Sequence, residues 1–333
     1  RTDCNKIRSK FIDEHVSAPL TEWASTDQQS DRGLQRIVFK GIGQVLVTSI
    51  EVERAESQKG KTLGGSNSMY PADAEVLQHG LDARYAVDLI QIYERLQVRK
   101  GFDSYGAIAY FNEGKEIVGI WHIDPQSDDW RCRVAKPPEP RERVLLPSSS
   151  SPAPPRHRRW PMLNMTGLDQ PARHKLADDY YAWEHAKWTF KTTLIVDIVV
   201  VKHLVEPHLL VSGPLATESK MLLRPDHWMR RFLRPLTFRS ITINDAAINT
   251  LLAEYGSVQR QTSLWQIDSL ERAIHRAADA YRFLSFPDWV ETKKLAAAET
   301  DALPLVEDGR RLWNIYETFV TKLVDTFVPP DAS

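Results

Sequence analysis

Residues 183–214 contain the most apolar run of the chain and read WEHAKWTFKTTLIVDIVVVKHLVEPHLLVSGP. This stretch has no glycine or proline before Pro207, and its apolar residues continue over many turns. This pattern predicts one long helix over about residues 178–211. Asp197 interrupts its most apolar part, and the whole chain has no run of 18 apolar residues, so we expect no transmembrane segment.

Two histidines in this helix, His203 and His208, have the spacing His-x4-His. On a regular α-helix, residues five apart lie about 140° apart around the axis and do not share one metal ion. A π-helical distortion with i→i+5 bonding would bring both rings to one face. Pro207 lacks an N–H and disturbs a regular helix, so we expect a distorted helix here whether or not a metal binds. A pair of ordinary helix histidines remains the alternative.

The remaining chain divides by pattern into an N-terminal and a C-terminal part. The C-terminal part shows helical periodicity over about 219–233, 243–255, 267–284, 287–299 and 306–327. In the N-terminal part we expect a short hairpin or two strands at 34–50, helix at 71–98, and a β-hairpin at 105–124. Asn112-Glu113-Gly114-Lys115 is the expected hairpin turn.

Between the two parts, residues 136–161 are rich in proline and serine. Such a stretch has little apolar surface to offset its ordering entropy, which indicates a linker or exposed loop. The sequence therefore predicts an α+β region at 1–135, this linker, and a mainly α-helical domain at 162–333.

Bulk composition excludes several classes of protein. The net charge is −1 without a strongly basic half, so no nucleic-acid partner is expected. Two cysteines, Cys4 and Cys132, are too few for a disulfide framework. No apolar signal segment follows Arg1, so a secretory signal is either absent or removed, which leaves the cytoplasm and secretion both open.

Several segments in the C-terminal part together resemble the lipoxygenase family. Trp183-x-x-Ala186-Lys187 is similar to the motif that opens the family's long core helix, and His203 and His208 follow at the family's His-x4-His spacing. The stretch 222–244 resembles the segment with the family's His-Pro and Ile-Asn, and the match continues from Tyr255 to Trp265. Asp308, Gly309 and Trp313 fit the family's Asp-Gly-x-x-x-Trp.

This resemblance implies a non-haem iron or manganese enzyme that oxygenates polyunsaturated fatty acids. Hydrogen is abstracted from a bis-allylic carbon, and O2 then adds to give a hydroperoxide. His203 and His208 would be metal ligands, whereas His227 and Asn244 would have structural roles. Leu194, Val199 and Leu209 would pack the core helix or line a lipid channel.

The family's other ligands would follow the last matched segment: a second pair on a later helix, and the main-chain carboxylate of a C-terminal Ile or Val. We therefore expect a complementing C-terminal segment beyond Ser333. Glu206 and Asp197 are nearby carboxylates, but neither has a geometric claim as a ligand. The alternative function is a degenerate lipoxygenase-like protein that binds a lipid or polyketide, or a metal-free cyclase.

Overall fold

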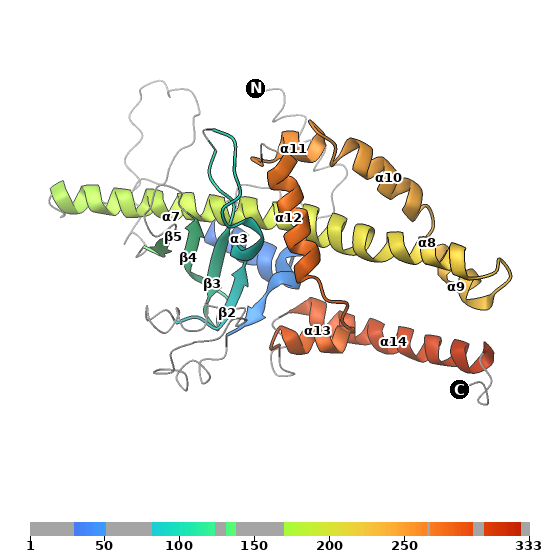
Figure 1. The fold of residues 1–333 in the computed structure, drawn as a ribbon. Helices are drawn as coiled ribbons and strands as arrows, with labels where there is room; N and C mark the ends of the chain where they lie inside the picture. The colour runs from blue at the N-terminus through green and yellow to red at the C-terminus, as the bar shows by residue number, and fades with distance from the viewer. Residues whose placement is uncertain are drawn as a thin grey trace, which may run out of the picture.

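A computed structural model describes residues 30–50, 82–100, 102–123, 131–137, 170–264, 267–295 and 303–327. Within these ranges the chain is mainly α-helical with one small antiparallel sheet, which confirms the predicted fold class (Figure 1). None of the described helices is long and apolar enough to cross a membrane. The predicted linker falls almost entirely outside the described residues, so the domain division stays a prediction.

The sheet is a meander in the order β1-β2-β3-β4-β5, with antiparallel neighbours. Its strands are β1 (Thr48–Ser49), β2 (Tyr85–Asp88), β3 (Ala107–Phe111), β4 (Ile117–Ile123) and β5 (Arg131–Ala135). The predicted hairpin at 105–124 is confirmed as β3 and β4. Its turn closes where Lys115 N–H donates to the Asn112 carbonyl at 2.9 Å, and Lys115 takes a left-handed φ of 64°.

Two N-terminal predictions are wrong. Most of 34–50 is helical, as α3 (Asp31–Phe39) and the 3-10 helix η2 (Ile42–Leu46), because Ser30 caps α3 through the Gly33 N–H and its apolar residues share one buried face. The described part of 71–98 is β2 followed by the short helix α6 (Ile90–Tyr93), not one helix. Strand β2 is buried on both faces, so its sequence lacks the alternation that marks a half-exposed strand. Residues 71–81 lie outside the described residues.

One continuous helical axis organises the C-terminal part. It consists of α7 (Gln170–Val196), the π-helix η3 (Asp197–Ser212) and α8 (Gly213–Leu222), and Val196, Ser212 and Gly213 at the junctions keep right-handed helical angles. The predicted long helix at 178–211 is therefore confirmed and extends further at both ends. The predicted helix at 219–233 is wrong as one element, because the axis ends at Leu222 and a new helix begins at Trp228.

The other four predicted helices are present with shifted ends, as α10 (Ser240–Thr250), α12 (Ile267–Ala280), α13 (Phe286–Thr292) and α14 (Pro304–Phe327). Two further helices are α9 (Trp228–Leu236), which begins inside the predicted 219–233, and α11 (Ser257–Gln261), which the sequence did not predict. Helix α14 meets α9 where Phe327 stacks on Trp228, with ring centroids 5.5 Å apart, and where the ring centroid of Phe319 lies 6.2 Å from that of Phe232 (Figure 1). Within 304–327 its one buried side chain is Val306. Trp313 and Leu323 are half-buried, and the exposed apolar residues recur at helical spacing as Leu312, Ile315, Tyr316, Phe319, Val320, Val324 and Phe327.

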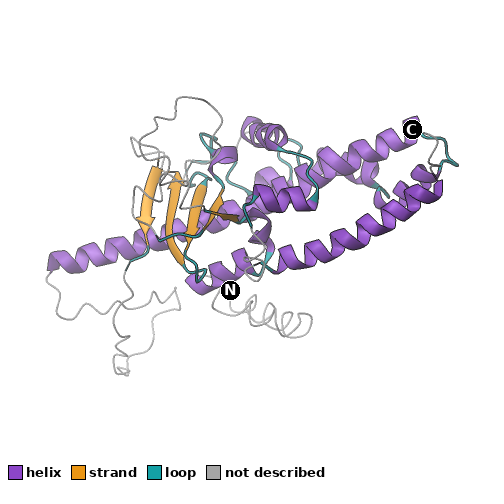
Figure 2. Cartoon of the chain, turned by 90° about the horizontal axis from the view of Figure 1, so that it is seen from below, coloured by secondary structure: helices purple, strands orange, loops and turns teal. Residues whose placement is uncertain are grey.

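The main core lies where the sheet packs across α7 (Figure 2). Helix α7 contributes Trp183, Ala186, Phe190 and Leu194, which meet side chains of α3 and of the strands β2 to β4. This core therefore joins residues on both sides of the predicted linker. Farther along the axis, Val196 and Val200 pack with Tyr93, Tyr105 and residues of α12 in a second cluster.

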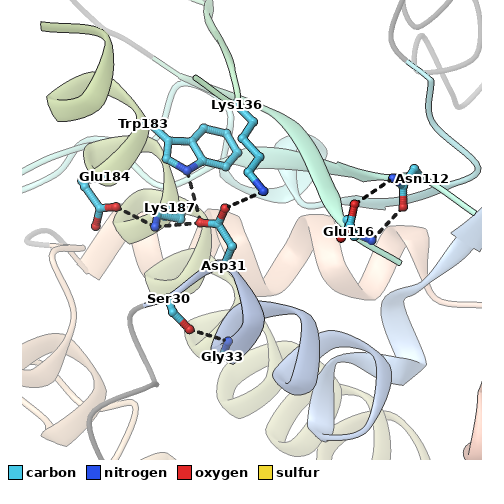
Figure 3. Close-up of polar contacts among 9 residues, drawn as sticks. All are labelled: Ser30, Asp31, Gly33, Asn112, Glu116, Lys136, Trp183, Glu184 and Lys187. Atoms are coloured by element: carbon cyan, nitrogen blue, oxygen red, sulfur yellow. Dashed lines mark hydrogen bonds and ion pairs between the residues drawn. The ribbon is translucent and has the colours of Figure 1, made fainter. Parts of the chain in front are cut away.

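An ion-paired carboxylate ties α3 to α7 at one end of this core (Figure 3). Asp31 accepts hydrogen bonds from Trp183 Nε1 at 3.2 Å and Lys187 Nζ at 2.9 Å, and Lys136 Nζ lies 3.2 Å from its other oxygen. Burial alone would raise the pKa of Asp31, but Lys187 and Lys136 outweigh it, and the pKa is lowered. The Trp-x-x-Ala-Lys motif thus holds α3 through its first and last side chains.

Leu194 and Ile195 provide a matched test of the α7 core. Leu194 is fully buried, whereas its neighbour Ile195 is 44% exposed. Leu194→Ala should lower the free energy of unfolding by about 2–5 kcal/mol because it leaves a cavity. Ile195→Ala should cost about 1 kcal/mol or less, since that side chain keeps access to water. Urea unfolding followed by circular dichroism measures both, and equal losses would contradict this packing.

Candidate metal half-site on the π-helix

The π-helix η3 carries both predicted metal ligands. Its i→i+5 bonding places residues five apart on roughly the same face, which a regular α-helix does not. The imidazole rings of His203 and His208 accordingly meet edge to face, with centroids 5.1 Å apart and planes at 88°. The expected helix distortion is confirmed, and it brings the two histidines together.

The next turn fixes the backbone at His208. The His208 carbonyl accepts from Gly213 N–H in an i→i+5 bond, from Ser212 Oγ at 3.3 Å and from Asn244 Nδ2 at 2.6 Å. Gly213 makes the last contact feasible, because a Cβ there would lie 2.7 Å from Asn244 Nδ2. Asn244, predicted to be structural, is buried on α10 and joins that helix to the half-site.

The two rings are suited to part of a ligand set. His208 Nδ1 is buried and has no hydrogen-bond partner within the described ranges, and His203 is exposed beside it. Metal–nitrogen bonds of about 2.1 Å place the centroids of two imidazoles on one ion roughly 5 Å apart, which agrees with the observed pair. Among the described residues, however, no group of three His, Cys, Asp or Glu side chains could hold a metal ion. The two imidazoles therefore fit half of a site.

Neither nearby carboxylate completes the set. Glu206 forms an ion pair with Lys202 one turn away on the same helix. Asp197 is buried at the start of η3, where its Oδ1 accepts from the Tyr93 hydroxyl at 3.2 Å. An aspartate within an apolar run indicates that its carboxylate is buried and has a hydrogen-bond partner. The sequence alone does not reveal that the partner of Asp197 is Tyr93.

The other predicted residues take different positions. His227 caps α9, where its Nδ1 accepts from Met229 N–H at 3.3 Å, and its ring stacks on Trp228. Leu194 lies in the α7 core, Val199 is 50% exposed, and Leu209 is half-buried against Val201, Val205 and Ala277. The structure thus brings His203, His208 and Asn244 together and leaves His227 on a separate helix.

Comparison with solved structures agrees with this arrangement. The chain is similar to fungal lipoxygenase from Fusarium graminearum. In one crystal form of that protein the sequence identity is 16% and the TM-score is 0.54, and in another the identity is 17% and the TM-score is 0.56. A lipoxygenase variant, Delta413-417:GS I805W LOX, matches with 14% identity and a TM-score of 0.57. Each similarity covers 90% of this chain.

The chain has a lipoxygenase-like fold. This confirms the resemblance seen in the sequence at the level of the fold, and it extends the likeness to the sheet region before Trp183. The chain spans only 46% of the Fusarium protein and 40% of the variant. No protein-family model matches the chain, and a search of curated proteins gives no match either.

The buried carboxyl of Asp197 predicts a pH-dependent stability in this lipoxygenase-like domain. Burial raises its pKa to about 6, against the opposing effects of Lys202 and the Tyr93 hydrogen bond. Because the folded state binds this proton more tightly than the unfolded state, the stabilisation is complete below the unfolded pKa of 3.8 and is lost as the pH rises through about 6.

Relative to Asp197→Asn, the natural chain should therefore lose about 3 kcal/mol of unfolding free energy between about pH 4 and pH 7. Urea titrations of both proteins at several pH values measure this difference. Parallel pH profiles would show that Asp197 does not titrate in this range.

Proposed function

We propose that this chain provides the first imidazole pair of a lipoxygenase-type non-haem metal dioxygenase that acts on polyunsaturated fatty acids. The observation that carries the proposal is the pair of His203 and His208 rings, whose centroids lie 5.1 Å apart on a π-helix within a lipoxygenase-like fold. Imidazole suits several transition metals, among them iron, copper and zinc, and the choice of iron or manganese rests on the resemblance. A bound ion would supply the redox chemistry that removes a hydrogen from a bis-allylic carbon before O2 adds.

The chain's own residues hold and orient this pair. His203 and His208 would each present one ring nitrogen to the ion. Asn244 and Gly213 bind the His208 carbonyl, so they keep the backbone in the i→i+5 geometry on which the ring pair depends. Val199 and Leu209, which are not fully buried, are the candidates for contact with an apolar substrate chain.

A complementing segment would supply the remaining ligands. Support comes from α14, whose exposed apolar residues recur at helical spacing, as on a helix that packs against another element. The matched lipoxygenases are also about twice as long as this chain. An apolar, helical C-terminal segment is therefore the partner that we propose for this face.

Metal binding tests the proposal directly. His203→Ala and His208→Ala should each weaken Mn2+ or Fe2+ binding by about tenfold or more, because loss of even an outer partner of a ligand has an effect of that size. His275→Ala is the matched control, since His275 is an exposed histidine on α12 that forms no group of three potential ligands with the pair among the described residues. Equilibrium dialysis with metal analysis gives the affinities, and oxygen uptake with linoleate gives the activity of the longest natural chain.

The alternative function is a lipoxygenase-like protein that binds a lipid or polyketide without redox chemistry, or a metal-free cyclase. The observation in its favour is that the described residues offer two imidazoles and no third ligand beside them. It is supported if the double variant His203→Ala/His208→Ala binds linoleate as tightly as the natural chain. Absence of both metal and oxygen uptake in the longest natural chain would then exclude the dioxygenase.

A further inference from the structure

A cavity of about 350 Å3 lies on the opposite part of the helical axis from the histidine pair. It opens between α7, Arg99 with residues 102–105, and the end of α11 at 260–263, which are far apart in the sequence. Trp188 in its wall precedes His203 by 15 positions on one axis, which is about 20 Å at 1.5 Å per residue. The cavity is therefore separate from the candidate metal half-site.

Hydrogen bonds between the loops hold the cavity walls in place. Arg99 N–H donates to the Ser263 carbonyl at 2.8 Å, and Ser263 N–H donates to the Tyr105 hydroxyl at 2.9 Å. The Arg99 guanidinium also donates to the Gln259 carbonyl. These bonds join Arg99 and Tyr105 to the α11 end, so the cavity is formed before any ligand arrives. Its volume is at the small end for ligand sites, which indicates a small ligand.

The wall presents positive charge and a surplus of hydrogen-bond donors. Arg99 and Arg260 both line the cavity, and among the described residues the Arg260 side chain has no ion-pair partner. The one lining carboxylate, Asp103, lies 2.9 Å from His185 Nε2. The hydroxyls of Thr189 and Thr262 are buried and have no hydrogen-bond partner in the part of the chain that the structure describes, and Thr189 is only 6% exposed.

A buried hydroxyl without a partner is costly unless a ligand or water satisfies it. Two such hydroxyls beside two guanidinium groups favour the binding of a ligand that accepts several hydrogen bonds and carries negative charge. Trp188 and Phe102 also line the cavity and offer aromatic surface to an apolar portion of the same molecule.

We propose that this cavity binds a small organic anion, a carboxylate or a phosphate monoester that carries a short apolar or aromatic group. Arg260 and Arg99 pair with the oxyanion, and Thr189 and Thr262 donate hydroxyl hydrogen bonds to it. Trp188 and Phe102 pack against the apolar group. This binding function does not depend on the metal half-site.

Isothermal titration of the full 333-residue chain tests this with benzoate and phenyl phosphate as probes and benzyl alcohol as the neutral control. Both anions should bind saturably, and the tighter one identifies the oxyanion that the cavity prefers. Arg260→Ala should weaken binding by about tenfold or more, and Thr189→Val by about fivefold, because each removes a donor and Val keeps the shape of Thr. Arg272→Ala is the matched control, an exposed arginine on α12 outside the cavity.

Circular dichroism and melting curves first establish that each variant is folded like the natural chain. The proposal is overturned if neither anion binds, if benzyl alcohol binds as tightly as benzoate, or if Arg260→Ala changes the affinity no more than Arg272→Ala. Loss of metal binding in the His203→Ala variant with intact benzoate binding is expected, since the two sites are separate.

Discussion

The change from α-helical to π-helical hydrogen bonding at Asp197 is the constraint on which the candidate site depends. Before it, α7 presents one face to the sheet and packs the core through Phe190 and Leu194. Beyond it, the same backbone axis continues with a different period, so residues five apart face the same way. One continuous helix can therefore serve both as the centre of a packed core and as the carrier of a histidine pair, with Asn244 and Gly213 securing the far end of the π-helix.

Features encoded in local sequence were predictable. The turn at Asn112–Lys115 determines the β3–β4 hairpin, and the combination of Pro207 with the His-x4-His spacing predicts a distorted helix. The likeness to lipoxygenases was visible because matched residues are spread over several helices in order. Even so, the end of the axis at Leu222 was missed, because the apolar pattern runs through the break before Trp228.

Features that depend on distant residues were not predictable. The stretch 34–50 has several β-branched residues, which favoured strands. The segment 31–39 nevertheless forms a helix, because Ser30 caps it and Asp31 binds Trp183 and Lys187, about 150 positions later in the chain. Strand β2 gives no alternating pattern because both of its faces are buried. The anion cavity combines three separate segments, and no local motif marks Arg260 or Thr189 as neighbours.

Continuous-wave electron paramagnetic resonance of Cu2+ tests most directly whether η3 pairs the rings of His203 and His208. The spectra of the natural chain and of His203→Ala are compared. If η3 brings the two rings together, one Cu2+ should show coupling to two equivalent imidazole nitrogens, and the variant should show one. If the segment were a regular α-helix, the rings would point about 140° apart. The spectrum of His203→Ala would then match that of the natural chain, which would contradict the π-helical half-site.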